Sequence, residues 1–224
     1  MSIAALPFDE AAIARQRGWS WLQARTGRLL DWTVALWILC GSVVITEPSP
    51  YELIFFLVLA VSLLAGSFAF RRETLGLVVL WAAFIPFAII AAFQPKYTAT
   101  TDALVFQVVT IFLFFTAVWA AAYVAEAPQQ RMRIIIGAYT ATAVISALLG
   151  TLGYLSLIPG HDVLTLYGRA KALFNDPNVF GPFLILPAMY ALQRVLLGTP
   201  RRAVIAGGIF MVIVVGVFAS FSRA

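Results

Sequence analysis

Charged residues are scarce in this sequence: Asp, Glu, Lys and Arg make up 11% of its 224 residues, whereas hydrophobic residues make up 62%. In soluble globular domains about a quarter of the residues are charged. The low charge content and the mean hydropathy of +0.94 therefore exclude an ordinary soluble domain. The net charge of +5 does not indicate a nucleic-acid partner, because no clustered basic face or stripe accompanies it.

Cysteine and histidine each occur only once. The single cysteine, Cys40, excludes an internal disulfide, and we interpret it as a small apolar side chain packed within a membrane span. The only histidine, His161, lies in a polar loop, and we assign it no catalytic role.

Long apolar runs are what the sequence has in abundance. A helix needs roughly 20 apolar residues to cross a bilayer, and in lipid a spanning segment must satisfy its own backbone polar groups, which favours helices. We therefore predict an all-α, polytopic integral membrane protein with about seven transmembrane helices. The predicted spans are Leu30–Thr46, Tyr51–Phe70, Thr74–Phe93, Asp102–Val124, Ile134–Ile158, Pro177–Leu197 and Ala203–Phe221.

The distribution of basic residues predicts how these spans are oriented. Cytoplasmic loops of membrane proteins carry the excess of Lys and Arg. If the spans alternate, 11 of the 15 basic residues fall on the side of the N-terminus, and the others are Lys96, Arg169, Lys171 and Arg223. We therefore predict that the N-terminus lies inside and the C-terminus outside, with an external loop at residues 159–176.

The first 29 residues are predicted to be a cytoplasmic N-terminal segment, followed by a transmembrane helical domain over residues 30–224. Trp19 and Trp21 lie among arginines in the N-terminal segment. This composition suits a short amphipathic helix that lies on the inner surface of the membrane.

The predicted spans contain no Asp, Glu, Lys, Arg or His at mid-depth, and the sequence shows no internal repeat. Ionisable residues at membrane depth mark ion and proton pathways, and many transporters are built from repeated halves. Coupled ion transport is therefore disfavoured. Thr142, Ser146 and Gly150 follow a small-residue spacing that allows close packing between membrane helices.

A polar stretch with two basic residues, YGRAKALFNDPN at residues 167–178, interrupts this apolar pattern. Pro177 suits the first position of a helix, and Asp176 before it suits the N-cap. Free N–H groups at a helix start attract anions, and Arg169 and Lys171 lie just upstream. The stretch is therefore predicted to hold a phosphate or diphosphate. The alternative is that its basic residues only attract anionic lipid headgroups.

The sixth predicted span contains two internal prolines, Pro182 and Pro187. Each removes a helical hydrogen bond, which frees the carbonyl groups of Asn178 and Phe183. One interpretation is a bent helix that fits around its neighbours. The other is that the bend opens a lateral cleft in which a lipid tail lies beside the external loop.

The polar stretch also resembles a known family. Arg169 followed by FNDPNVFG at residues 174–181 resembles the external motif of the O-antigen ligase and O-antigen polymerase superfamily of bacterial inner membranes. The segment ASFSRA at residues 219–224 looks like the family's Ser-Arg-small element. In the family the interval after the arginine often contains glycine, whereas this chain has Ala170 and Ala172.

The resemblance implies a membrane glycosyltransferase that transfers or polymerises glycan from an undecaprenyl-diphosphate carrier on the periplasmic face, to a glycan or lipid acceptor, without a metal or another cofactor. The family's additional catalytic residues lie in a large periplasmic loop after further spans. We therefore assign no catalytic residue and expect the chain to be the N-terminal part of a longer protein. The alternatives are a non-enzymatic transporter or flippase for lipid-linked glycans, and a scaffold for a partner subunit.

The candidate site combines the residues of the polar stretch with those of the C-terminal element. The candidate substrate-binding residues are Arg169, Lys171, Asn178 and Arg223, and the residues expected to shape the site are Asp176, Pro177 and Pro182.

Overall fold

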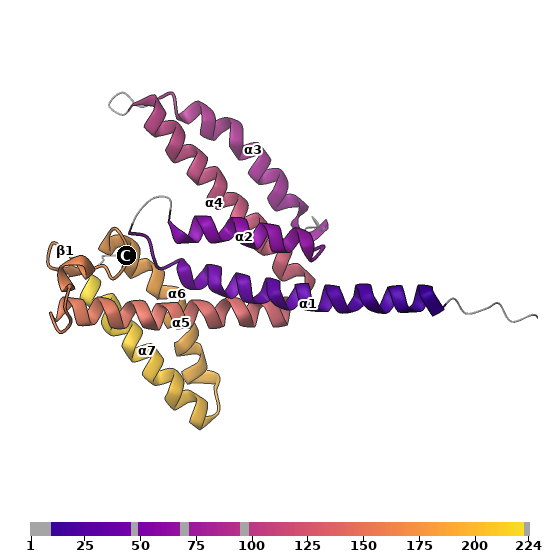
Figure 1. The fold of residues 1–224 in the computed structure, drawn as a ribbon. Helices are drawn as coiled ribbons and strands as arrows, with labels where there is room; N and C mark the ends of the chain where they lie inside the picture. Colours follow the sequence, from indigo (N-terminus) through magenta and orange to yellow (C-terminus); the bar gives the residue numbers. More distant parts are fainter. Residues whose placement is uncertain (1–9, 46–48, 68–71, 95–98, 222–224) are drawn as a thin grey trace, which may run out of the picture. The chain divides into compact units, whose positions relative to one another are not determined.

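The computed structural model describes residues 10–45, 49–67, 72–94 and 99–221, with side chains from residue 25 onward, and this part of the chain is almost entirely helical (Figure 1). It forms seven α-helices, two short 3-10 helices and one two-stranded β-hairpin. In chain order these are α1 (Glu10–Cys40), α2 (Pro50–Leu64), η1 (Arg72–Thr74), α3 (Leu75–Ala91), α4 (Thr100–Glu126), α5 (Pro128–Tyr154), η2 (His161–Leu164), β1 (Thr165–Leu166), β2 (Arg169–Ala170), α6 (Pro177–Leu197) and α7 (Pro200–Ser220).

The chain divides into two units. The first contains α1 as far as Trp32, α2 from Leu59 onward, and η1, α3 and α4. The second contains the rest of α1, α2 as far as Val58, and the chain from Pro128 onward. The predicted boundary after residue 29 falls inside α1, which runs without a break from Glu10 to Cys40.

In the first unit, α3 and α4 lie side by side and polar atoms on their aromatic side chains are paired (Figure 1). The indole Nε1 of Trp81 on α3 donates a 3.0 Å hydrogen bond to the carbonyl group of Ile111 on α4. The hydroxyl group of Tyr123 donates a 2.6 Å bond to Oδ1 of Asp31 on α1. Because polar groups in lipid must find partners within the protein, these bonds suit a helical unit in a membrane.

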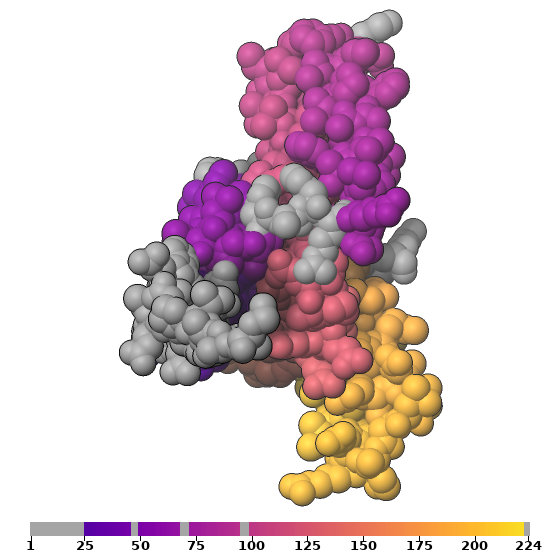
Figure 2. Space-filling model, turned by 90° about the vertical axis from the view of Figure 1, so that its right-hand side faces the viewer, coloured from indigo at the N-terminus to yellow at the C-terminus, as the bar shows by residue number. Residues whose placement is uncertain are grey.

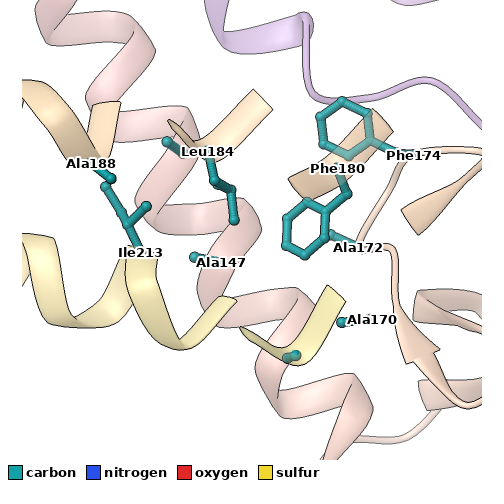
Figure 3. Close-up of a cluster of buried hydrophobic side chains, with 10 residues drawn as sticks. Ala147, Ala170, Ala172, Phe174, Phe180, Leu184, Ala188 and Ile213 are labelled. Atoms are coloured by element: carbon teal, nitrogen blue, oxygen red, sulfur yellow. The ribbon is translucent and has the colours of Figure 1, made fainter. Parts of the chain in front are cut away.

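In the second unit, α5, α6 and α7 pack around a cluster of buried apolar side chains (Figure 3). Figure 2 shows α6 and α7, in orange and yellow, in contact with each other. The predicted packing face of α5 is confirmed, because Thr142, Ser146 and Gly150 are all buried. A Cβ atom at Gly150 would lie 2.8 Å from the Phe180 ring of α6, so the absence of a side chain there allows the two helices to approach.

Five helical segments of the described chain are long and apolar enough to cross a membrane: η1 with α3 (Arg72–Ala91), α4, α5, α6 and α7. Apolar side chains on these helices point outward, and Phe106 and Val204 are 68% and 77% exposed. Exposed apolar surfaces of this kind mark contact with a membrane or a partner. The helices therefore indicate a membrane protein. The sixth predicted span is confirmed at both ends, at Pro177 and Leu197.

The first two predicted spans differ from their helices: α1 begins 20 residues before the predicted Leu30, and α2 ends before the predicted Phe70. α2 has 15 residues and ends at Leu64, although the apolar run continues towards Phe70. Gly66 adopts a left-handed φ of 67°, and the N–H group of Ser67 bonds to the carbonyl group of Ser62 at 3.0 Å. This is a Schellman motif, which ends a helix. The count of seven spans and the orientation of the chain stay predictions.

Candidate anion-binding site

Arg169 is placed by the β-hairpin between α5 and α6. β1 and β2 pair antiparallel, with Leu166 opposite Arg169. The turn residues Tyr167 and Gly168 have φ values of 53° and 71°. Positive φ at both central residues is typical of a type I′ turn, whose twist matches that of the paired strands. The turn therefore fixes the backbone from which the Arg169 side chain extends.

Two alanines whose side chains are fully buried, Ala170 at the end of β2 and Ala172 after it, hold this segment in place. The N–H groups of Lys171 and Ala172 both donate to the carbonyl group of Leu164, at 2.9 and 3.1 Å. Ala172 has a left-handed φ of 49°, which costs a residue with a side chain roughly 1–2 kcal/mol. Its methyl group lies in the buried cluster beside Phe180 (Figure 3), and this packing offsets the backbone strain.

α6 begins as the sequence predicts, with Asp176 as the N-cap and Pro177 as the first helical residue. Oδ1 of Asp176 accepts a 2.6 Å hydrogen bond from the N–H group of Asn178. The backbone carbonyl of Asp176 accepts from the N–H groups of Val179 and Phe180, at 3.0 and 3.2 Å. The N–H groups at this helix start are therefore not free, contrary to the expectation. The donors are in use, and the Asp176 carboxylate would repel an anion at that point.

The guanidinium group of Arg169 instead links the hairpin to the ends of two helices. Its Nε donates a 2.7 Å hydrogen bond to the carbonyl group of Ser220, the last residue of α7. Its Nη2 donates a 2.9 Å bond to Oδ1 of Asn178. A guanidinium has five N–H donors, and these two bonds use two of them. Within the described residues, the other three make no hydrogen bond.

Two features of this arrangement also suit a purely structural role. The last carbonyl groups of a helix have no partner within the helix, and a cation near the C-terminal end of a helix is favoured by the helix dipole. Arg169 therefore donates to a carbonyl group at the C-terminal end of α7. The side chain is half-buried, so part of it remains accessible.

The other candidate residues are distributed unevenly around Arg169. Asn178 contacts it directly, whereas Nζ of Lys171 donates a 3.0 Å bond to the carbonyl group of Phe174 and so closes its own loop. Pro182 is exposed on α6, and Arg223 lies outside the described residues.

The sequence interpretation missed Ser220 as a partner of Arg169. The Ser-Arg-small element had drawn attention to this end of α7 through Arg223, but the contact is made by a backbone carbonyl group. Every residue carries such a group, so no residue type in the sequence could have indicated it.

No protein-family model, curated protein or solved structure matches this chain. The resemblance to the O-antigen ligase and polymerase superfamily is therefore a hypothesis that rests on the motif residues alone. In the described part of the chain, no group of three or more His, Cys, Asp or Glu side chains could hold a metal ion. The chemistry that the Arg169 site suits best is the binding of an anion.

Proposed function

We propose that this protein is a bacterial inner-membrane glycosyltransferase of the O-antigen ligase or polymerase type, which moves glycan from an undecaprenyl-diphosphate carrier on the periplasmic face. The oxygen of an acceptor hydroxyl group, on a glycan or a lipid, bonds to the anomeric carbon of the donor sugar, and the hydroxyl proton passes to solvent. The bond from that carbon to the diphosphate oxygen breaks, and the diphosphate leaves with the electron pair. The role proposed for Arg169 is to bind the diphosphate as negative charge develops on it.

The observation that supports this role is the fixed orientation of the Arg169 guanidinium. Two hydrogen bonds, to Ser220 and Asn178, hold it in place before any ligand arrives. Donors that are already oriented stabilise a developing charge without reorganisation at the moment of reaction. A guanidinium also matches phosphate oxygens with two parallel hydrogen bonds, and the three remaining N–H groups of Arg169 allow such a contact.

A flippase for lipid-linked glycans would also use a cationic site outside the membrane. Moving a charged headgroup across the bilayer would favour charged residues along its path, and the predicted spans carry none at mid-depth. We therefore favour the glycosyltransferase. The closer competitor is a structural role, in which Arg169 only satisfies the end of α7.

Asn178→Asp separates the structural role from the diphosphate role. The substitution keeps the shape of the side chain and places a carboxylate against Nη2 of Arg169, so the link between the helix ends is kept or strengthened. The same carboxylate competes with diphosphate for the guanidinium. We expect unchanged thermal stability with a large loss of glycan transfer, measured for the intact protein in proteoliposomes with lipid-linked glycan and acceptor. Unchanged stability together with unchanged transfer would leave Arg169 a structural residue.

Arg169→Lys tests whether the two-pronged contact matters. An ammonium group keeps the charge but not the fork, so we expect transfer to fall by about 100- to 1000-fold, the usual effect of losing one such transition-state contact. Arg201→Lys is the matched control, since Arg201 is an exposed arginine at the start of α7, at the far end of that helix. If the Arg169→Lys rate stayed within a few-fold of wild type while Arg169→Ala was inactive, a nonspecific charge effect would replace the proposed diphosphate contact.

A further inference from the structure

The α6–α7 hairpin borders a cavity at the end opposite to the β-hairpin. Gly198 and Thr199 connect the two helices, and a cavity of about 230 Å³ lies between α5, α6 and α7. A second cavity of about 280 Å³ lies at the connection and shares Tyr190, Arg194 and Arg202 with the first. A single water needs only about 10–15 Å³, so both cavities have room for a larger group.

The two cavities differ in polarity along the hairpin. Ala191, Ile205 and Ile209 border the first, whereas Gln193 and Thr199 border the second, next to the connection. A molecule that occupies both therefore needs an apolar part along the helices and a polar part at the end of the hairpin. Both α6 and α7 are long and apolar enough to cross a membrane. When they do, the short connection between them lies at a membrane surface.

The region shared by the cavities carries positive charge without a counter-ion from its own helices. Arg194 and Arg202 border both cavities, and α5, α6 and α7 contain no Asp or Glu. The guanidinium of Arg194 lies 5.7 Å from the centre of the Tyr190 ring, a cation–π contact that helps to orient it. Oγ1 of Thr140, in the wall of the first cavity, is buried without a hydrogen-bond partner in the described structure. A buried polar atom is costly until it is paired.

We propose that this cavity binds the headgroup of an anionic phospholipid, with the phosphodiester between Arg194 and Arg202 and the apolar part of the lipid along α6 and α7. Guanidinium groups match phosphate oxygens, and basic pockets between membrane helices suit anionic headgroups. The Thr140 hydroxyl pairs with a polar oxygen of the bound lipid. A free phosphate would use the two arginines but would leave the apolar wall of Ile205 and Ile209 without a partner, and for this reason we favour the lipid.

Binding is measured by native mass spectrometry of the full chain in detergent, titrated with phosphatidylglycerol. Losing a charge-assisted hydrogen bond weakens binding by about tenfold or more, so we expect Arg194→Gln and Arg202→Gln each to lower the affinity by that factor. Arg201→Gln is the matched control. Arg201 is exposed, lies next to Arg202 in the sequence, and borders neither cavity. The affinity of the Arg201→Gln variant for phosphatidylglycerol should therefore equal that of the wild type.

The control and two further measurements can overturn the assignment. If Arg201→Gln weakens binding as much as Arg202→Gln, the arginines act only through surface charge. If inorganic phosphate binds with the same dependence on Arg194 and Arg202 while phosphatidylglycerol does not bind, the site is one for free phosphate. Thr140→Val should weaken lipid binding while leaving the stability of the lipid-free protein unchanged or higher, because it removes an unpaired hydroxyl. Unchanged lipid affinity in this variant would contradict the proposed position of the headgroup.

Discussion

The hydroxyl group of Tyr139 on α5 donates a 2.7 Å hydrogen bond to the backbone carbonyl of Phe183 on α6. This carbonyl is the one left without a helical partner by Pro187, which lies four residues further along and has no N–H group. An unpaired carbonyl is costly within a membrane. The tyrosine of a neighbouring helix therefore replaces the missing bond, and α6 continues through the proline to Leu197.

Tyr139→Phe is expected to lower the free energy of unfolding by about 1–2 kcal/mol, because it leaves the Phe183 carbonyl unpaired. Unfolding in detergent micelles, followed by circular dichroism, gives this value. Pro187→Ala supplies the control, since it restores the N–H group at position 187. In that background Tyr139→Phe should lower the free energy of unfolding much less. An equal loss of stability in both backgrounds would contradict the proposed link between Tyr139 and Pro187.

Gly150→Ala is expected to destabilise the protein by about 1–3 kcal/mol, the usual cost of overpacking. A Cβ atom there would lie 2.8 and 3.0 Å from two carbons of the Phe180 ring, which is itself fully buried and has no room to move. Gly137→Ala is the matched control in the same helix, because a Cβ there meets nothing within 4 Å. It should raise stability by roughly 0.5–1 kcal/mol through helix propensity. Similar effects of the two substitutions in an unfolding experiment would argue against the packing of α5 on α6.

Helix ends were predictable where the sequence has capping residues or helix breakers at the edge of an apolar run. α6 begins at the Asp176–Pro177 pair and ends before Gly198, where a Cβ atom would overlap the backbone carbonyl of Arg194. The end of α2 was not predictable from hydropathy, because Gly66 lies inside an apolar run. A single glycine in such a run is compatible with a continuing helix, and only the backbone hydrogen bonds show that this one ends it.

In the candidate site, too, some features were predictable from the sequence and others were not. Arg169, Asn178 and the cap at Asp176 were predictable because their side chains are polar in an apolar sequence. The bond from Arg169 to Ser220 joins residues 51 positions apart through a backbone group, and such a contact depends on how α7 returns to the hairpin. The hydrogen bonds of Asp176 were also visible only in the structure. They show that its side chain and carbonyl group already accept from the first N–H groups of α6.

Asp176→Ala is expected to cost about 1 kcal/mol of stability, because the variant loses the side-chain oxygen that accepts from the Asn178 N–H group. Asp176→Asn should be nearly silent, since asparagine caps helices as well as aspartate does. Thermal unfolding of the three proteins in the same detergent provides the comparison. If the asparagine variant proved as unstable as the alanine variant, the negative charge at the helix start, rather than the cap, would be the stabilising feature.

The orientation of the chain can be tested at positions that leave the 11-to-4 distribution of basic residues unchanged. Cys40 is the only cysteine, so Cys40→Ala provides a background in which single cysteines can be introduced. Tyr167 is 90% exposed at the tip of the β-hairpin, and Gln129 is an exposed neutral residue in the first turn of α5. Because the excess of Lys and Arg faces the cytoplasm, a membrane-impermeant maleimide added outside should label Tyr167→Cys and not Gln129→Cys until the membrane is opened. The reverse pattern would place the Arg169 site in the cytoplasm, where a periplasmic glycan transfer could not take place.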